Sequence, residues 1–514
     1  MHGRLGPASP YRQDMSDQVG LLERVKAHLR AMFDDRPVIV CGGPLAGLVR
    51  VAPQLRDLTS HRPLLLASGI GTGPLPGEDD AVVHVMPSET GDMMTSIRSM
   101  LARLADLPAD ALAAIEAYDP QCRAVVLPGA FFTGTEIAGR PVIEGRRPEW
   151  EALEDKTTVD ALWDSLGVAR PPSQVVPPRT ADLDRAARVL DAGAGTVWSG
   201  DATEGFNGGA EYVRWVRSPD RAEEAAAFFA AHCREVRVVP FCEGLPCSIH
   251  GFAFPDGVAA LRPVEMVVLR RFDDRFVYGG ISTHWDPPDA DREAMRDVAR
   301  RTAVHLRDTV GYRGGFSVDG VLTSDGFLPT ELNTRFSGGL GAISRGLPDF
   351  PLVFVQAALV SGHDPGIGAA EFERVLVDAA DEHRYGTGAS MVAAVAPTET
   401  ETRPVVFDGD TVRFSAGAEA GGCAVVNNSH GADGGAGRDG GVDRSDEADG
   451  RLMLGPSPTG GYLRFEPRQD RIERGTSIGP LVSSAFALAD AHWGTSIGAT
   501  TPAREAGAAV TGGG

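Results

Sequence analysis

The chain has 514 residues, 49 of them basic and 70 acidic, and a formal charge of −21 at pH 7. A chain of this length exceeds what one hydrophobic core usually serves, so we expect two or three domains. The negative charge argues against partners such as nucleic acid or an anionic membrane surface. Because the sequence has no apolar run of about 18 residues and no apolar N-terminal signal segment, it predicts a cytoplasmic protein that does not span a membrane.

The N-terminal third has the pattern of a parallel α/β domain. Residues 1–17 are polar and contain Gly and Pro, which predicts a disordered leader. Residues 18–150 then alternate helical patterns, over 21–33 and 92–104, with short buried strands at 37–41, 63–67, 81–86 and 124–127. The glycines at 42–43 and 69–73 follow strands and could cradle a phosphate. Structural turns are the favoured interpretation, since neither segment has the spacing of a nucleotide-binding motif.

Residues 151–380 predict a second domain with two lobes. A helix over 153–166 carries Lys156, a small α+β lobe spans about 170–240, and a lobe of longer strands spans about 241–380. Only Lys26 and Lys156 are lysines, so 47 of the 49 basic residues are Arg. A lysine in such a chain indicates a site that needs a compact, flexible charge, and an exposed helix lysine is the alternative.

Two carboxylates flank a predicted hairpin in the second lobe. The turn at 323–326 joins two apolar segments, which places Asp319 and Glu331 on paired strands. Together with Asn333 they form an all-oxygen ligand set that suits Mg²⁺ or Mn²⁺ bridging nucleotide phosphates. Arg335 adds a permanent positive charge for a phosphate or a developing oxyanion. A solvated hairpin with scattered charges is the alternative interpretation.

The C-terminal region is predicted to be less regular. Residues 381–496 contain strands and a helix, interrupted by a Gly- and Asp-rich insertion at 429–450 that we expect to be disordered. Residues 497–514 are predicted to be a disordered tail. The six cysteines include no CxxC pair, which predicts reduced thiols.

These motifs, taken in chain order, resemble the ATP-grasp superfamily, preceded by a pre-ATP-grasp domain at 18–150. The resemblance implies a fold with a parallel α/β domain followed by a two-lobed α+β ATP-grasp fold. It implies that Lys156 and a glycine loop hold the triphosphate, that a hinge strand meets adenine, that Asp319, Glu331 and Asn333 bind metal, and that Arg335 is catalytic. The loop residues are Gly205, Phe206, Asn207, Gly208 and Gly209, and the hinge residues are Phe241, Cys242 and Glu243.

Two features refine the resemblance. The segments 199–209 and 239–251 look most like the peptide ligase of pheganomycin biosynthesis and its relatives. The second phosphate-binding lysine of many family members is absent, because Val197, Trp198 and Ser199 occupy that strand. Arg214, Arg262 or Arg270 could replace it. Arg270 is also a second candidate catalytic residue, on a strand that could face the acceptor carboxylate.

The resemblance implies an ATP-dependent ligase that joins a carboxylate, from a small molecule or an amino acid, to an amine or peptide substrate through an acyl phosphate. Secondary-metabolite peptide assembly is the implied setting. A carboxylase that phosphorylates bicarbonate, a non-catalytic nucleotide-binding regulator, and a transferase using Cys242 or Cys247 are the alternatives. A homodimer is one of the assemblies that the sequence leaves open.

Overall fold

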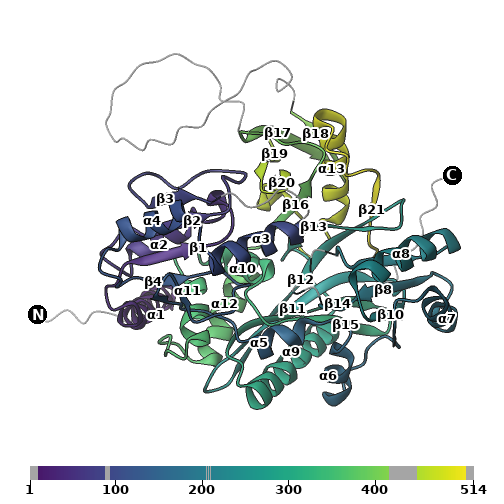
Figure 1. Cartoon of the computed structure of the whole chain (residues 1–514), viewed down its shortest axis with the longest axis horizontal. Helices are drawn as coiled ribbons and strands as arrows, with labels where there is room; N and C mark the ends of the chain where they lie inside the picture. Colours follow the sequence, from purple (N-terminus) through teal and green to yellow (C-terminus); the bar gives the residue numbers. More distant parts are fainter. Residues whose placement is uncertain are drawn as a thin grey trace, which may run out of the picture.

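The structure is a computed structural model that describes residues 10–86, 93–203, 205, 208, 210–415 and 448–504, with side chains described from residue 19. It has a mixed α/β fold with a parallel sheet, a small antiparallel sheet and a large antiparallel sheet (Figure 1). The predicted fold class, a parallel α/β domain followed by α+β lobes, is confirmed. The predicted insertion at 429–450 and the tail after 504 lie almost entirely outside the described residues.

The N-terminal domain is built on a four-stranded parallel sheet in the order β3-β2-β1-β4. Its strands are β1 (Val38–Cys41), β2 (Leu64–Ala67), β3 (Val82–Val85) and β4 (Val125–Leu127). Every residue of β1, β2 and β4 is buried, which explains why these strands are continuous apolar runs. The helices of this domain are α1 (Pro10–Phe33), α2 (Val51–Arg56), α3 (Met93–Ala105) and α4 (Ala109–Tyr118). Helix α1 therefore begins inside the segment that was expected to be a disordered leader.

The small lobe contains an antiparallel sheet in the order β7-β10-β8-β9. Its strands are β7 (Gln174–Val176), β8 (Thr196–Gly200), β9 (Val213–Val216) and β10 (Val236–Pro240), with helices α7 (Thr180–Leu190) and α8 (Pro219–His232). Leu183, Trp198 and Phe229 are fully buried in the core of this lobe. Trp198 is a core residue of this lobe, and its Nε1 donates to Thr196 Oγ1 at 2.9 Å.

The third sheet has 11 strands and forms the centre of the molecule. Its first strands are β11 (Leu245–Ala253), β12 (Val258–Arg271), β13 (Phe276–Ser282), β14 (Gly314–Thr323) and β15 (Gly326–Asn333). The C-terminal strands β16 (Gly386–Val392), β17 (Glu401–Asp408), β18 (Thr411–Phe414), β19 (Gly450–Ser457) and β20 (Gly460–Pro467) continue the same sheet, because β16 pairs with β13. The predicted boundary at residue 381 therefore does not separate two sheets.

The remaining helices cover this sheet. They are α5 (Pro148–Glu151), α6 (Val159–Ser165), α9 (Asp289–Val310), α10 (Gly338–Ile343), α11 (Leu352–Val360), α12 (Ala369–Glu382) and α13 (Gly479–Trp493). Strand β21 (Thr500–Pro502) pairs with β12, so the expectation of disorder from residue 497 is wrong for residues 497–504. Backbone hydrogen bonds to the edge of β12 supply the order that the composition of this segment does not predict.

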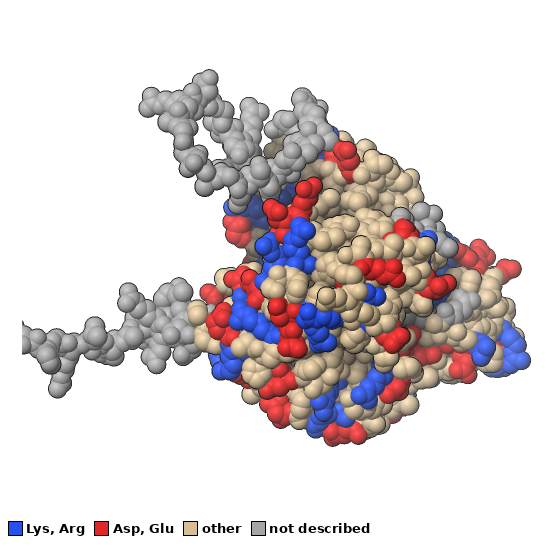
Figure 2. Space-filling view, turned by 60° about the vertical axis from the view of Figure 1, so that its left-hand side comes forward, with Lys and Arg blue, Asp and Glu red and all other residues tan. Residues whose placement is uncertain are grey.

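The charged surface is mixed. Acidic and basic side chains are interspersed on the face that Figure 2 shows, which is the pattern of a solvated surface with many ion pairs. Among the described residues, no helix is long and apolar enough to cross a membrane.

Candidate active site

Asp319 and Glu331 are direct cross-strand neighbours. Asp319 lies on β14 and pairs in register with Glu331 on β15, and Asn333 pairs with Ser317 two residues along the same ladder. The turn at 323–326 starts this ladder, as the sequence predicted, and a β-bulge at Thr330 then shifts the register by one residue, which brings Glu331 opposite Asp319. The three predicted metal ligands are therefore brought together on one hairpin.

A hydrogen-bond network fixes the Asp319 carboxylate. Asn333 Nδ2 donates to Asp319 Oδ2 at 2.8 Å, and Ser248 Oγ on the neighbouring strand β11 donates to Oδ1. Burial, and then the charge of Glu331, raise the pKa of Asp319 to about 6, while the Ser248 hydrogen bond opposes the shift. Two carboxylates held this closely repel each other, and a divalent cation between them would remove that repulsion.

The donor set fits Mg²⁺ or Mn²⁺ better than a soft metal. The described residues include no group of three or more His, Cys, Asp or Glu side chains placed to hold a metal ion. Mg²⁺ needs fewer protein ligands, because it commonly binds one or two carboxylates together with water and substrate phosphates. Asp319, Glu331 and the amide oxygen of Asn333 are the groups that would hold it.

Lys156 is buried beside this hairpin. It lies in the turn between a short 3₁₀ helix at Ala152–Glu154 and α6, not within a helix as predicted, and it is 7% exposed. Its Nζ donates to Glu331 Oε1 at 2.9 Å. The alternative of an exposed helix lysine is therefore wrong, and the ammonium is held against a carboxylate of the candidate metal site.

Arg335 extends from the end of β15 into a second polar cluster that sequence reasoning missed. Its Nη2 donates to Asn333 Oδ1 at 2.6 Å and its Nε donates to Glu154 Oε2 at 3.2 Å. Glu154 also accepts from Arg146 Nη2 at 2.7 Å and from the Thr334 backbone amide at 2.9 Å. The guanidinium is thereby oriented next to the metal ligands, and its plane lies over the ring of Phe131, 4.9 Å from its centroid.

The glycine loop begins close to Lys156. The backbone amide of Ala202 donates to Asp155 Oδ2 at 3.2 Å, so the residue before Lys156 holds the start of the loop. Gly205 has a φ of +92°, a backbone conformation that favours glycine. Gly208 is also described, whereas the predicted positions Phe206, Asn207 and Gly209 lie outside the described residues.

The predicted hinge residues follow β10 and lie under a stack of aromatic rings. Phe241 stacks on Trp215 of the small lobe with centroids 4.3 Å apart, and Trp215 also stacks on Phe276 of β13. Arg270 forms two hydrogen bonds to Glu243, at 2.6 and 3.0 Å, and lies over the Phe241 ring. Cys242 is half-buried.

Arg270 is therefore grouped with the hinge and not with Arg335. Val264 of β12 pairs with Ser248, which in turn pairs with Asp319. Arg270 lies six residues along β12 from Val264, a distance of about 20 Å at the usual rise per residue of a strand. The structure thus separates the two residues that were both predicted to be catalytic.

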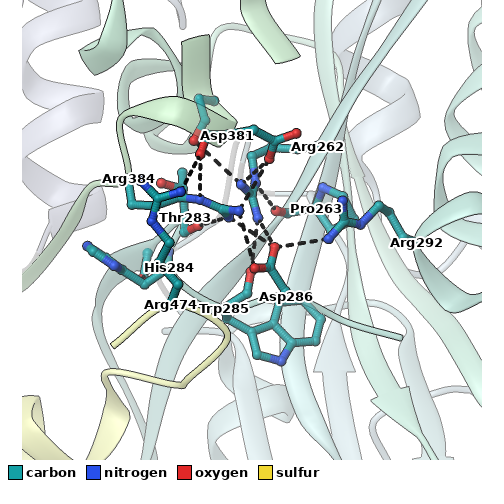
Figure 3. Close-up of polar contacts among 12 residues, drawn as sticks. Arg262, Pro263, Thr283, His284, Trp285, Asp286, Arg292, Asp381, Arg384 and Arg474 are labelled. Carbon is teal, nitrogen blue, oxygen red and sulfur yellow. Dashed lines mark hydrogen bonds and ion pairs between the residues drawn. The ribbon is translucent and has the colours of Figure 1, made fainter. Parts of the chain in front are cut away.

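The three arginines considered as replacements for the missing lysine differ in position. Arg214 pairs in register with Trp198 and lies over the ring of Phe228, 4.0 Å from its centroid. Arg262 is 2% exposed and pairs with Asp286 and Asp381 in a network that also includes Arg384 and Arg292 (Figure 3). Because both amino groups of Arg262 bind these carboxylates, its role is structural.

Two further alternatives lose support. The five described cysteines are free thiols, and burial raises the pKa of both Cys242 and Cys247, which disfavours a thiolate nucleophile. The second alternative is a role for His284 in deprotonating the amine. His284 is buried with its Nε2 3.0 Å from Gln469 Oε1, which is the environment of a structural side chain.

A large cavity lies close to Arg335, which itself lines a small adjoining cavity together with Ala130 and Phe336, two residues that the large cavity shares. It has a volume of about 800 Å³ and is bounded by the N-terminal domain, by α10 and by the C-terminal strands. Phe131, on which Arg335 lies, and Gly338 are part of its wall. Gly339 packs so closely on His250 that a Cβ there would lie 2.2 Å from the imidazole, so this glycine is required for packing.

No protein-family model matches the chain, and no curated protein matches it significantly. Several solved structures do. The biotin carboxylase domain of 2-oxoglutarate carboxylase from Hydrogenobacter thermophilus is 13% identical, with 84% of this chain and 86% of that chain covered and a TM-score of 0.48. L-amino acid ligase from Bacillus licheniformis is 13% identical, with 72% and 82% covered and a TM-score of 0.43. N5-carboxyaminoimidazole synthase from Aspergillus clavatus is 13% identical, with 89% and 100% covered and a TM-score of 0.44.

Proposed function

We propose that this protein is an ATP- and Mg²⁺-dependent ligase of the ATP-grasp type, which joins a carboxylate to an amine and releases ADP and phosphate. The observation that carries the proposal is the convergence of Asp319, Glu331 and Asn333 with Lys156 and Arg335. Two carboxylates, an amide oxygen and two permanent cations in one place suit a divalent metal and a triphosphate.

The chemistry follows from the poor reactivity of a carboxylate, whose leaving group would be oxide. Transfer of the γ-phosphoryl group of ATP to a carboxylate oxygen gives an acyl phosphate and ADP. The amine then attacks the carbonyl carbon, the C–O bond to phosphate breaks, and the amine nitrogen loses a proton. The metal, when bound, neutralises charge on the transferring phosphoryl group.

Each residue of the chain has a distinct role in this proposal. Lys156 supplies a compact cation for the phosphates, and the glycine loop at 205–209 would cover them and exclude water from the acyl phosphate. Arg335 stabilises negative charge that develops on the carbonyl oxygen, because Glu154 and Asn333 hold its guanidinium in place. Phe241, Cys242 and Glu243, with Arg270, form the nucleotide-base end of the site.

We propose an amide or peptide bond as the product. A cavity of about 800 Å³ close to Arg335 has room for an amino-acid or peptide substrate. The resemblance of residues 199–209 and 239–251 to pheganomycin-type peptide ligases favours a setting in secondary-metabolite peptide assembly, and that setting stays a prediction.

Phosphate release from MgATP tests the proposal. The purified chain is incubated with pairs of acids and amines, and phosphate, ADP and the condensed product are measured together. A ligase releases phosphate only when both substrates are present. ATP binding without substrate-dependent phosphate release across a broad panel would contradict the ligase and favour the non-catalytic regulator.

A further inference from the structure

The cavity beside Arg335 has a mainly apolar wall with a cationic end. Met100 and Ile97 of α3, Phe336 and Met391 contribute apolar side chains from three parts of the chain. Arg345, which follows α10, and Arg464 of β20 contribute guanidinium groups, and Tyr385 lies between them. Arg345 lies over the Tyr385 ring at 4.8 Å, and Arg464 Nη2 lies 3.5 Å from the Tyr385 hydroxyl.

The charge of Arg345 is poorly compensated. Within the described part of the chain no carboxylate forms an ion pair with Arg345, whereas Arg464 pairs with Glu466 at 2.5 Å. Burial and then the charge of Arg345 lower the pKa of Arg50, with Tyr385 and Asp349 opposing, so a second guanidinium interacts with Arg345. An arginine that faces a cavity next to another arginine is a candidate partner for an anionic ligand group.

A ligand that spans this cavity would contact cations at two places. Arg335 lines a small adjoining cavity that shares Ala130 and Phe336 with this one, so one end of the ligand lies close to the catalytic group. The carboxylate that reacts at this end is converted to an acyl phosphate. A cationic group at the other end of the cavity is needed only if a substrate carries a second anionic group that the reaction does not consume. An α-amino acid that acts as the amine carries such a carboxylate.

We propose that the amine substrate is an α-amino acid, or a short peptide, with a large apolar side chain, and that its own carboxylate binds Arg345 with Arg464 beside it. The apolar side chain packs against Met100, Ile97 and Met391. This inference rests on the proposed ligase function, and it names the substrate class of the same site.

Binding without nucleotide tests the inference separately from turnover. Isothermal titration calorimetry of the full chain is carried out with L-phenylalanine, L-leucine and L-methionine, and with L-phenylalaninamide, which lacks the carboxylate. We expect at least one of the three amino acids to bind, and L-phenylalaninamide to bind about 10-fold or more weakly than L-phenylalanine. Binding of none of the three, or equal affinity for the acid and the amide, would overturn the inference.

Two variants test whether Arg345 binds the carboxylate of the amino-acid substrate. Arg345→Gln should weaken binding of the amino acid about 10-fold or more and leave that of the amide unchanged, so that the two affinities become similar. Arg185→Gln is the matched control, because Arg185 is an exposed arginine of α7, and it should bind as the unmodified chain does. An Arg345→Gln chain that still distinguishes acid from amide would show that the carboxylate binds elsewhere.

A third variant examines the apolar end. Met100→Trp fills part of the cavity and should weaken binding of L-phenylalanine more than that of L-alanine. An equal effect on both would contradict the placement of the side chain. If these binding results hold while MgATP is never hydrolysed with any acid, the proposed function fails and the amino-acid site stands.

Discussion

Lys156 and Glu331 are 175 positions apart in the sequence, and their side chains meet at 2.9 Å. The side chain of Lys156 is 8% exposed and that of Glu331 is 23% exposed, so the pair is largely shielded from water. A buried charge that loses its partner is costly, and this relationship links the nucleotide end of the proposed site to its metal end.

Replacing the two lysines of the chain one at a time separates these roles. Lys156→Met should abolish measurable ligation and lower stability by about 3 kcal/mol, because it leaves Glu331 without its cation. Lys26→Met is the matched control, since Lys26 pairs with an Asp57 that is 57% exposed, and such pairs contribute less than about 1 kcal/mol. Steady-state rates and urea unfolding of both variants provide the test. Equal activity of the two variants would remove Lys156 from the site.

Arg335→Ala should reduce kcat by about 10²–10³, the usual cost of losing one donor to a developing oxyanion. Folding should survive, because Glu154 keeps its hydrogen bonds to Arg146 and to the Thr334 amide. Rapid-quench measurement of turnover, with circular dichroism as the folding control, checks this. Near-normal turnover would contradict the assigned role.

Arg270→Gln should affect ATP binding more than the chemical step. Arg270 contacts Glu243 and Phe241 at the hinge. It lies about 20 Å along β12 from Val264, the residue aligned across the sheet with Ser248 and Asp319. We expect a several-fold increase in the KM for ATP with kcat within about two-fold. A large fall in kcat at saturating ATP would instead restore the sequence-based prediction that Arg270 is catalytic.

Arg262→Met should destabilise the fold without changing the KM for ATP. The guanidinium lies within the buried network of Figure 3, where it binds Asp286 and Asp381. Removing it leaves those carboxylates with fewer partners, and we expect a loss of about 3 kcal/mol in the free energy of unfolding. Chemical denaturation and ATP titration are the measurements. An increased KM for ATP at unchanged stability would show that Arg262 replaces the missing lysine after all.

Glu144 gives a prediction on pH. Burial raises the pKa of Glu144 from 4.5 to about 8, so the folded chain keeps this carboxyl protonated where the unfolded chain ionises it. Glu144 therefore makes its full contribution to the free energy of unfolding below pH 4.5, and this contribution is lost as the pH rises toward 8. Glu144→Gln mimics the neutral acid and avoids this loss.

The stabilisation of Glu144→Gln over the original chain, measured as Tm, should accordingly be small at pH 4.5, grow up to about pH 8 and then level off. A difference in Tm that does not change with pH would show that Glu144 is ionised in the folded state. Glu371→Gln is a suitable control, because Glu371 is an exposed carboxylate of α12.

Local pattern was sufficient for much of the fold. Three of the four strands of the parallel sheet follow a continuous apolar run, and the turn at 323–326 starts the hairpin that carries Asp319 and Glu331, whereas a β-bulge at Thr330 sets their direct pairing. A hairpin depends on residues close in sequence, so its geometry can be read from turn chemistry and alternation. The prediction of disorder is wrong for residues 497–504, because β21 obtains its hydrogen bonds from β12, more than 200 residues earlier.

The sequence by itself determined the chemistry available at the hairpin, namely two carboxylates, an amide and a following arginine on adjacent strands. Only the tertiary structure decided that Lys156 binds Glu331, that Ser248 and Glu154 hold Asp319 and Arg335, and that Arg345 faces a cavity with Arg464. The physical reason is distance along the chain. Contacts between such remote residues form only when whole sheets and helices pack together, and no local propensity records them.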